Sequence, residues 1–405
     1  MHTPSLSSIA GQPLQKGSLI LGDHLLTGVS LPAMVLHQTV IEHNIAWMQR
    51  FADHHHARLA PHGKTTMMPA LFRRQIEAGA WGITLATATQ CAAAFAHGVR
   101  RLIMANQLVG QANMALVAQM IEDGLDFYCT VDHADNVRTL NDVFAARGQR
   151  LQVLIELGVS GGRCGVRNAD ELAALVEAVR QAPALKLAGI EGYEGMIGGD
   201  DALEDVRAYG QRLVDTVRHL HDSGVLATPA PIVTASGSKW FDLIAEAFDQ
   251  AELREHYTPV LRPGCYVAHD HRLYREAMEA VSERRPDLEG ALAPALEVFA
   301  QVQSLPEPGL AIVSMGKRDI SCDPDLPMAL RLYRDSQYMR DVTDWQVVHI
   351  MDQHTFLRVP EGDDIGIEDI IAFGASHRCL TFDKWRQGLW VDDTLAITAV
   401  EPTFF

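Results

Sequence analysis

The organisation of this chain can be read from one segment, Ala60-Pro61-His62-Gly63-Lys64-Thr65-Thr66, which has Lys64 at its centre. Apolar residues lead into the segment, and the helix-like stretch Met68 to Ala78 follows it. Lys64 is therefore predicted at the carboxyl end of a strand, where α/β barrels keep their catalytic residues. A lysine there is suited to forming a Schiff base with a carbonyl compound or with pyridoxal phosphate (PLP), whereas an ordinary lysine would be solvated at the surface.

Outward from this segment, short apolar runs alternate with longer stretches of helical period between residues 33 and 265. This βαβα rhythm predicts a parallel sheet, and its length fits a (β/α)8 TIM barrel better than an open sheet. Helices are expected at Asp170–Gln181 and Ala202–Asp222, among others. The expected strands are Ala33–Leu36, Ala57–Pro61, Gly82–Ala86, Leu102–Ala105, Leu125–Val131, Leu151–Leu157, Leu187–Tyr193, Ile232–Ala235 and Pro259–Leu261. One strand is surplus to a barrel, and we expect the first of them to lie outside it.

After residue 265 the rhythm stops. Arg272–Arg284 is expected to be a helix, and most of the apolar runs beyond it have no helix between them, which favours an antiparallel sheet. These runs are Ala295–Gln303, Leu310–Val313, Trp345–Met351, Phe356–Val359, Ile370–Phe373 and Leu389–Ala399. We therefore predict an α/β barrel domain at 31–265 and a C-terminal antiparallel β-domain at 266–405, to which residues 1–30 contribute a strand.

Composition limits the partners. The chain has 405 residues, of which 47% are hydrophobic and 21% charged, as in soluble globular proteins. The net charge of -17 argues against nucleic acid and against an anionic membrane surface, but not against a small anionic substrate. We expect no transmembrane helix, and no signal peptide in Met1–Leu14. The scattered cysteines are expected to be reduced thiols of a cytoplasmic protein; they are Cys91, Cys129, Cys164, Cys265, Cys322 and Cys379.

Three loops after predicted strands could bind a ligand, and two of them could bind an anion. In Gly161–Gly165, glycines allow close approach of the backbone and Arg163 supplies a cation, although spacing alone favours an exposed loop arginine. Thr234–Ser238 precedes a helix-like stretch, where N–H groups and hydroxyls form an anion site or simply cap the helix. Arg262–Tyr266 follows the next strand, and the loops after the last two barrel strands are the usual phosphate cradle.

Two histidine motifs raise the question of a metal. His377 and Cys379 flank one residue in a loop-like stretch, and imidazole plus thiolate favours zinc, although an incidental pair is the default explanation. Gln353-His354 either orients a metal ligand or contains a core histidine. His54-His55-His56 ends a helical stretch and is expected at the surface, because adjacent helical residues point in different directions.

Together these segments resemble the D-serine dehydratase and D-threonine aldolase family, which are fold-type III PLP enzymes related to alanine racemase. The resemblance runs from residue 60 to residue 379 and includes a Pro-His-x-Lys-Thr signature around Lys64. It implies that Lys64 holds PLP, that Arg163 contacts the phenolic oxygen of the cofactor and that Tyr193 neighbours its ring. It also implies a phosphate site formed by Ser236, Gly237, Ser238, Gly264, Cys265 and Tyr266.

The resemblance also bears on the metal. D-serine dehydratases of this family place a zinc-binding His-x-Cys near the end of the β-domain, which implies that His377 and Cys379 bind Zn²⁺. D-threonine aldolases usually have aspartate in place of the cysteine and use manganese-like ions such as Mn²⁺. They also carry a histidine just after Tyr-x-Gly for retro-aldol proton abstraction, whereas this chain has Met196 there.

We therefore expect a PLP- and zinc-dependent dehydratase that converts D-serine or D-threonine to a 2-oxo acid and ammonia. The alternative is a metal-dependent aldolase that cleaves the same 3-hydroxy-D-amino acids to glycine and an aldehyde; Met196 and Cys379 weigh against it. A racemase would leave the metal pair unexplained, and non-catalytic PLP-storing proteins of this fold consist of the barrel alone. The family places its active site between the barrel and the β-domain of a dimer, which implies a homodimer.

Overall fold

The computed structural model describes residues 15–405; Met1–Leu14, where we expect no signal peptide, lie outside this range. The chain forms two compact units. One, the barrel unit, comprises Ala46–Lys64 and Pro69–Gly264. The other, the β-unit, comprises the residues up to Ile45, Thr65–Met68 and Cys265–Phe405. The backbone therefore passes between the units four times, at Ile45–Ala46, Lys64–Thr65, Met68–Pro69 and Gly264–Cys265.

The barrel unit holds an eight-stranded sheet in which every neighbouring pair is parallel. The strand order is β2-β9-β8-β7-β6-β5-β4-β3. The strands are β2 (Arg58–Leu59), β3 (Ile83–Leu85), β4 (Arg101–Gln107), β5 (Asp126–Val131), β6 (Leu151–Leu157), β7 (Leu185–Gly192), β8 (Ile232–Ala235) and β9 (Thr258–Leu261). An isolated parallel bridge joins His62 to Thr84, and the Thr84 N–H donates to the Pro61 carbonyl at 2.9 Å. This seam closes the sheet, so the predicted barrel is confirmed.

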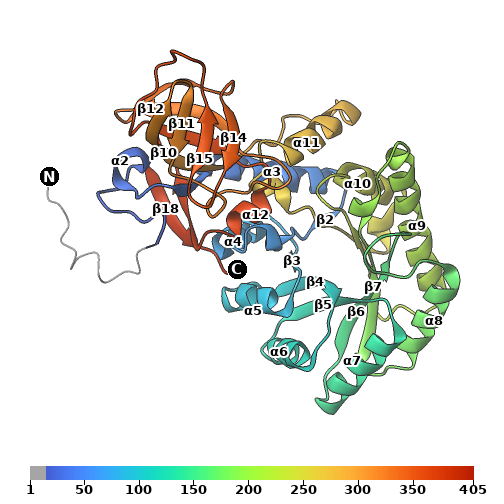
Figure 1. Ribbon diagram of the computed structural model, residues 1–405. Coiled ribbons are helices and arrows are strands. Elements are labelled where there is room, and N and C mark those ends of the chain that lie inside the picture. Colours follow the sequence, from blue (N-terminus) through green and yellow to red (C-terminus); the bar gives the residue numbers. More distant parts are fainter. Residues whose placement is uncertain (1–14) are drawn as a thin grey trace. The chain divides into compact units, whose positions relative to one another are not determined.

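Helices follow the barrel strands and cover the outer face of the sheet (Figure 1). They are α4 (Pro69–Glu77), α5 (Ala88–Ala96), α6 (Gln111–Glu122), α7 (Ala134–Ala146), α8 (Ala169–Arg180), α9 (Ala202–Asp222) and α10 (Phe241–Gln250), with the short turns η1 (Gly63–Thr65), η2 (Glu194–Met196) and η3 (Leu253–Glu255). The barrel interior is filled by one apolar cluster, so it is a packed core and not a channel. That cluster comprises Ala60, Ile103, Tyr128, Leu154, Ala188, Ile232 and Val260.

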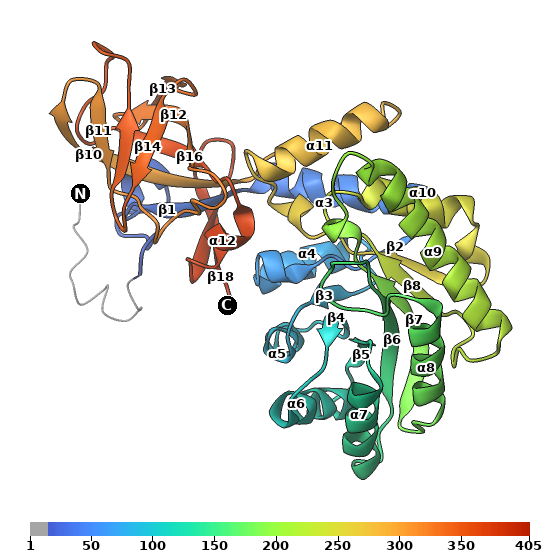
Figure 2. The ribbon, with the colours of Figure 1, turned by 45° about the vertical axis from the view of Figure 1, so that its right-hand side comes forward.

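The β-unit holds a ten-stranded sheet that is antiparallel except where β1 (Ala33–His37) runs parallel to β17. The remaining strands are β10 (Leu296–Glu307), β11 (Leu310–Val313), β12 (Met328–Arg334), β13 (Gln337–Asp341), β14 (Gln346–Ile350), β15 (Thr355–Arg358), β16 (Ile370–Gly374), β17 (Gln387–Val391) and β18 (Ile397–Pro402). Its helical segments are α2 (Leu25–Gly28), η4 (Cys265–Val267), α11 (Leu273–Arg284) and α12 (Arg378–Phe382), and α3 (Gln38–His54) links the two units. Figure 2 shows this sheet in a second view, turned by 45° from that of Figure 1.

Most strand predictions for the β-unit are confirmed, and the differences are as follows. The first predicted strand, β1, lies outside the barrel as expected, because it pairs with β10 and β17. Residues 31–45, which were included in the predicted barrel range, therefore group with the β-unit. The run Leu389–Ala399 forms parts of two strands, and β12 and β13 were not predicted. Residues 15–30 contribute the isolated bridges Leu19–Val29 and His24–Ala396 in place of the expected strand.

Two further observations concern the whole described chain. Among residues 15–405, no helix is long and apolar enough to span a membrane. None of the six cysteines, all of which lie within the described residues, forms a disulfide, which agrees with the expected reduced thiols.

Candidate active site

A polar layer lies above the apolar core of the barrel, at the carboxyl ends of its strands. Side chains of alternate strand residues point to the same face. Two positions beyond the core residues Ala60, Leu154 and Val260 come His62, Glu156 and Arg262. The barrel mouth is therefore lined by ionisable side chains, whereas the layer below it is apolar.

Lys64 lies in the short turn η1, directly beyond this layer, and its side chain is exposed to solvent in the single chain. Gly63 packs so closely that an added Cβ would lie 2.5 Å from Phe72 Cε1, which fixes the turn against the barrel wall. Burial, followed by the positive charges of Lys64, Arg262 and Arg163, lowers the pKa of His62 well below its usual value. A neutral imidazole thus stands beside three cations.

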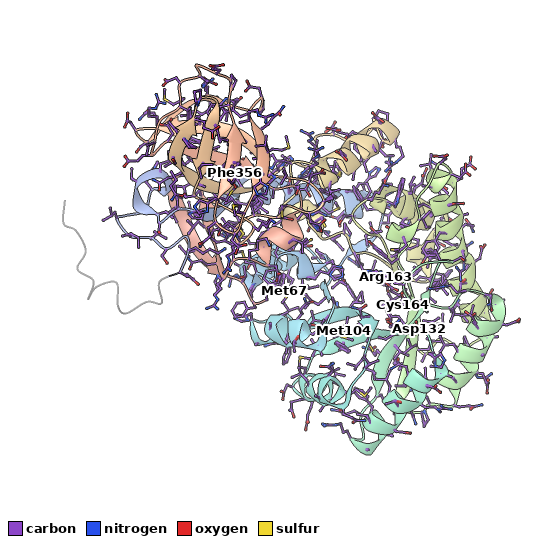
Figure 3. The ribbon with its side chains drawn as sticks, in the orientation of Figure 1. Met67, Met104, Asp132, Arg163, Cys164 and Phe356 are labelled. Atoms are coloured by element: carbon purple, nitrogen blue, oxygen red, sulfur yellow. The ribbon has the colours of Figure 1, made fainter. Side chains whose placement is uncertain are left out.

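Arg163 and Tyr193 lie together, with the guanidinium carbon 4.3 Å from the centre of the tyrosine ring. The loop that carries Arg163 is held by Asp132, which accepts a hydrogen bond from the Gly165 N–H at 2.8 Å. The side chains of Arg163, Cys164 and Asp132 gather at the same end of the barrel strands (Figure 3). The structure therefore brings together two of the residues that the resemblance assigns to the cofactor ring.

The loop after β8 binds an anion, but the anion is the side chain of Glu194. The fully buried carboxylate of Glu194 accepts hydrogen bonds from the N–H groups of Ser236, at 3.1 Å, and Gly237, at 2.5 Å. Ser236 adopts a positive φ of 90°, which is costly for a residue with a Cβ and is kept here by these bonds. Because α10 begins only at Phe241, the serines do not open or cap a helix as the sequence suggested.

Arg262 is a second residue whose role the sequence did not show. It is buried and donates to Glu191 and, at 2.7 Å, to the Gly192 carbonyl. Burial raises the pKa of Glu191, although Arg262 opposes this shift. Within residues 15–405, three buried polar atoms of the mouth find no hydrogen-bond partner: His62 Nδ1, Glu191 Oε2 and Arg262 Nε.

Glu156 completes the charged layer. Its carboxylate accepts a hydrogen bond from Gln107 Nε2 at 2.7 Å. Burial, followed by the nearby carboxylate of Glu191, raises the pKa of Glu156 to about 7. The barrel mouth therefore holds a carboxyl group that titrates near neutral pH.

His377 and Cys379 lie in the β-unit at the start of α12, which the sequence did not predict to be helical. His377 is the N-cap residue, yet its side chain makes no capping hydrogen bond. The Cys379 thiol donates to Thr65 Oγ1 at 3.5 Å. Burial, followed by the charge of Arg378, lowers the pKa of His377, which favours the neutral imidazole that metals bind. As the side chains stand, residues 15–405 contain no group of three or more His, Cys, Asp or Glu that could hold a metal.

Other predicted sites lie elsewhere or differ from expectation. His354 is exposed in the turn between β14 and β15, so the core-histidine explanation is wrong. His55 is buried with Nδ1 3.7 Å from Asp249 Oδ2, and only its neighbours His54 and His56 are exposed as predicted. Met196 lies in η2 and is 49% exposed.

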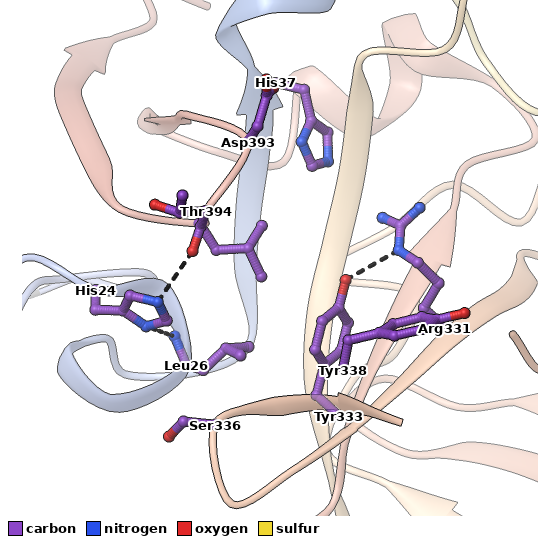
Figure 4. Close-up of a pocket in the computed structure, with 10 residues that line it drawn as sticks. His24, Leu26, His37, Arg331, Tyr333, Ser336, Tyr338, Asp393 and Thr394 are labelled. Carbon is purple, nitrogen blue, oxygen red and sulfur yellow. Dashed lines mark hydrogen bonds between the residues drawn. The ribbon is translucent and has the colours of Figure 1, made fainter. Parts of the chain in front are cut away.

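A separate hollow of about 420 Å³ lies within the β-unit (Figure 4). Arg331 on its wall donates to Tyr333 at 2.9 Å and to the buried carboxylate of Glu297. The charge of Arg331 is therefore already paired with Glu297. The same carboxylate also contacts His37 Nε2 at 2.9 Å. The hollow contains none of the residues that the sequence singled out, and we do not assign it to the active site.

The chain thus combines a closed (β/α)8 barrel, with a lysine turn at its mouth, and an antiparallel β-unit. Comparisons with known proteins identify the family that has this combination. The model of the alanine racemase N-terminal domain matches residues 36–254, and that of the serine dehydratase domain matches residues 295–391. The chain therefore belongs to the alanine racemase N-terminal domain family, with a dehydratase-type domain after the barrel.

Curated relatives of similar length match most of the chain. It is 26% identical over 302 residues to a D-threonine aldolase of an Arthrobacter species, covering 74% of each chain. It is 24% identical over 338 residues to a 3-hydroxy-D-aspartate aldolase of Paracoccus denitrificans strain Pd 1222, covering 82% of this chain and 81% of that one. It is 28% identical over 254 residues to the D-threo-3-hydroxyaspartate dehydratase of Delftia sp. strain HT23, covering 61% and 63%.

Solved structures share the fold. The D-threonine aldolase from Filomicrobium marinum superposes with a TM-score of 0.79 at 24% identity, over 95% of this chain and 97% of that one. The Delftia dehydratase gives a TM-score of 0.76 at 22% identity, over 94% and 99%. An alanine racemase of Clostridium difficile 630 gives 0.63 at 12% identity, over 92% and 99%. The fold is therefore alanine racemase-like, as predicted.

Proposed function

We propose that this chain is a lyase that uses PLP and a divalent metal ion to act on 3-hydroxy-D-amino acids. The observation that carries the proposal is the match along most of the chain to aldolases and a dehydratase that share such substrates by name. Their reactions all require negative charge to be stabilised at Cα of an amino acid. The lysine turn at the barrel mouth and the charged layer beneath it suit that task.

The residues of the barrel mouth fit PLP. The three unpartnered polar atoms of His62, Glu191 and Arg262 are buried where a polar cofactor would satisfy them. When bound, PLP supplies an electron sink for charge at the substrate Cα. Lys64 would bind its aldehyde and, when released, accept the Cα proton at Nζ. Arg163 would contact the phenolic oxygen, and Tyr193 would lie beside the ring.

The phosphate would be held by Ser238 together with Gly264, Cys265 and Tyr266. Because Glu194 takes the N–H groups of Ser236 and Gly237, those two residues would shape the loop and contribute less to the phosphate than the resemblance implies. Tyr266 is fully buried at the start of η4, which gives this side of the phosphate site a rigid base.

The donors in the β-unit fit zinc or another divalent ion. His377 provides an imidazole nitrogen and Cys379 a thiol, the donor pair that zinc favours. A solved mutant of the Delftia dehydratase, in which a cysteine is replaced by alanine, is described as metal-free. A bound divalent ion supplies a Lewis acid for the substrate hydroxyl oxygen. His377 and Cys379 would hold the ion, and water or substrate would complete its coordination.

Retro-aldol cleavage is the first candidate reaction, because the two aldolases match a larger share of this chain than the dehydratase does. In that reaction the Cα–Cβ bond breaks, the hydroxyl loses its proton and Cα gains one, giving glycine and an aldehyde. The sequence alone favoured the dehydratase over the aldolase, so the comparisons reverse the order of the two reactions. Dehydration remains the second candidate, because Met196 offers no base for the hydroxyl proton and Cys379 replaces the aspartate expected of an aldolase.

One incubation separates these reactions. The purified protein with PLP and Zn²⁺ or Mn²⁺ is given D-threonine, with L-threonine as the control. We expect glycine and acetaldehyde from the D-isomer in equal amounts and neither from the L-isomer. 2-Oxobutanoate with ammonia would replace the aldolase by the dehydratase, and L-threonine or L-allo-threonine formed alone would indicate a racemase. Borohydride treatment should fix pyridoxyl on Lys64, and labelling of another lysine would overturn the cofactor assignment.

A further inference from the structure

A second thiol lies beside the proposed metal ligands. Thr65 Oγ1, in a nearly fully buried residue, accepts the hydrogen bond from Cys379 Sγ at 3.5 Å and lies 3.9 Å from Cys265 Sγ. The two sulfur atoms, which are 114 positions apart in the sequence, thus contact one hydroxyl oxygen. Both cysteines are partly buried and free of disulfides.

The charges around the thiols link them to His377. The guanidinium of Arg378, which is 8% exposed, interacts with the thiols of both Cys265 and Cys379 and with the Asp270 carboxylate. The imidazole of His377 also interacts with the Cys265 thiol. Cys265, His377 and Cys379 therefore belong to one electrostatic cluster within the β-unit, although Cys265 comes from η4 and the others from the start of α12.

We propose that Cys265 is a further ligand of the metal ion that the proposed function assigns to His377 and Cys379. This inference rests on that function. Three protein ligands with one open position are the usual arrangement of catalytic zinc. Cys265 and Cys379 would bind the ion as thiolates, and each thiol would lose its proton to solvent on binding.

Asp270 is less suited to this role than Cys265. Its Oδ1 accepts N–H bonds from Arg272 and Tyr274, each at 2.9 Å, and its Oδ2 pairs with Arg378. Breaking these contacts would leave the buried guanidinium without its carboxylate, which is strongly unfavourable. Cys265 has a long contact with Thr65 Oγ1 and a hydrogen bond with the Arg378 side chain. Exchange of these contacts for a metal bond would leave Arg378 paired with Asp270.

Cys265 also connects the metal to the expected phosphate segment, because it follows Gly264 in the chain. A metal bound to its side chain would restrain the backbone that is proposed to hold the phosphate. Binding of the metal and of PLP would then be coupled, and such coupling is reciprocal. Loss of the Cys265 thiol should remove the coupling without removing either ligand altogether.

The test counts thiolates in the full-length protein loaded with Co²⁺ under reducing conditions. Thiolate-to-cobalt charge-transfer absorption should indicate two thiolates in the wild type and one in Cys265→Ser and Cys379→Ser. Cys322→Ser, which changes another partly buried thiol of the β-unit, should keep two. Zinc should bind Cys265→Ser more weakly by over about 100-fold, beyond the 10- to 100-fold loss typical of outer-shell changes.

Each other outcome overturns the inference in a recognisable way. One thiolate in the wild type, lost in Cys379→Ser only, would leave the metal site intact without Cys265. A loss in Cys322→Ser would assign the second thiolate to that residue instead. No cobalt binding by the wild type would end both this inference and the metal part of the proposed function. Alkylation needs no variant: zinc should protect Cys265 and Cys379, but not Cys322, from iodoacetamide, as read by peptide mass spectrometry.

Discussion

At the barrel mouth, buried carboxylates hold the loops in place, whereas the motif residues that the sequence points to are exposed. Lys64 and Arg163 are exposed in the chain, whereas Glu191 and Glu194 are buried and fix the neighbouring loops. The motif residues could be predicted because glycine, serine and lysine at strand ends have recognisable uses. The role of Glu194 could not be predicted from the sequence. In Gly-Tyr-Glu-Gly it resembles an ordinary turn residue, and its hydrogen-bond partners Ser236 and Gly237 lie some 40 positions further along the chain.

Ser238 and Ser236 should respond differently to loss of the hydroxyl. Ser238→Ala removes one proposed bond to an ionised phosphate, worth roughly 1.5–3 kcal/mol, so PLP affinity should fall about ten- to a hundred-fold. Ser236→Ala is the matched control, because the Ser236 hydroxyl makes a weak 3.4 Å contact with the Gly237 carbonyl and its N–H serves Glu194. Spectroscopic PLP titration measures both. Equal losses would mean that the phosphate contacts Ser236 as closely as Ser238.

Glu156 should make stability depend on pH. Burial, Glu191 and Asp132 raise its folded-state pKa to about 7 from 4.5, against the effect of the Gln107 hydrogen bond. The folded chain then binds more protons than the unfolded chain at intermediate pH. The resulting stabilisation is complete below about pH 4.5 and is lost as the pH rises through about 7, on the order of 2–3 kcal/mol in all.

Thermal unfolding between pH 5 and pH 8 measures this dependence. The Tm of Glu156→Gln, which cannot ionise, should rise relative to that of the wild type as the pH increases. Glu122→Gln, which changes an exposed carboxylate on α6, should leave the difference flat. A Tm difference for Glu156→Gln that does not change with pH would show that the carboxyl group titrates normally.

At the scale of elements, periodicity predicted the barrel strands well because each is a short apolar run between helices. It failed at β12 and β13, where Met328–Asp341 mixes arginine, tyrosine and glutamine with few consecutive apolar residues. It merged β17 and β18, because the Asp392-Asp393 turn between them is short. Closure of the barrel by His62 and Thr84 depends on a contact between two loop-proximal positions, which no local pattern indicates.

Two buried threonines of the barrel sheet, one at the seam and one away from it, form a matched pair. Thr84 in β3 donates its hydroxyl to the Ala60 carbonyl at 2.8 Å across the closing edge, so Thr84→Val should destabilise the barrel unit by roughly 1–2 kcal/mol. Thr130 in β5 is equally buried, but its hydroxyl has no partner among the described residues, so Thr130→Val should be neutral or slightly stabilising. Thermal unfolding of both variants measures the difference. A similar loss in both would mean that the seam bond contributes nothing specific.

At the scale of the molecule, the resemblance implies a homodimer, and two-fold pairing is the commonest arrangement of soluble oligomers. Light scattering should therefore give a mass of about 89 kDa, twice the 44.5 kDa of one chain. The expectation concerns assembly alone, because the fold of each unit is complete in a single chain. A 44.5 kDa species that turns over substrate at the assay concentration would contradict it.

The division of labour between the units should make metal and cofactor separable. The proposed covalent attachment lies at Lys64, in the barrel unit, whereas His377 and Cys379 belong to the β-unit. PLP provides its own electron sink, so its attachment requires no metal, whereas breaking a bond at the hydroxyl-bearing carbon is aided by a Lewis acid. Chelator-treated protein, and His377→Ala, should therefore keep the PLP absorbance of the wild type yet form neither aldehyde nor 2-oxo acid from D-threonine.

Added zinc should restore the chelated wild type but not His377→Ala. His349→Ala, which changes an exposed histidine of β14 in the same unit, is the control and should remain active. Because deprotonation at Cα depends on Lys64 and PLP, exchange of the substrate Cα proton with deuterated solvent should persist without metal. For a dehydratase this would place the block after proton removal, and for an aldolase it would show that Lys64 and PLP still activate Cα. Full product formation by the metal-free protein would instead show that the β-unit donors have no part in the reaction.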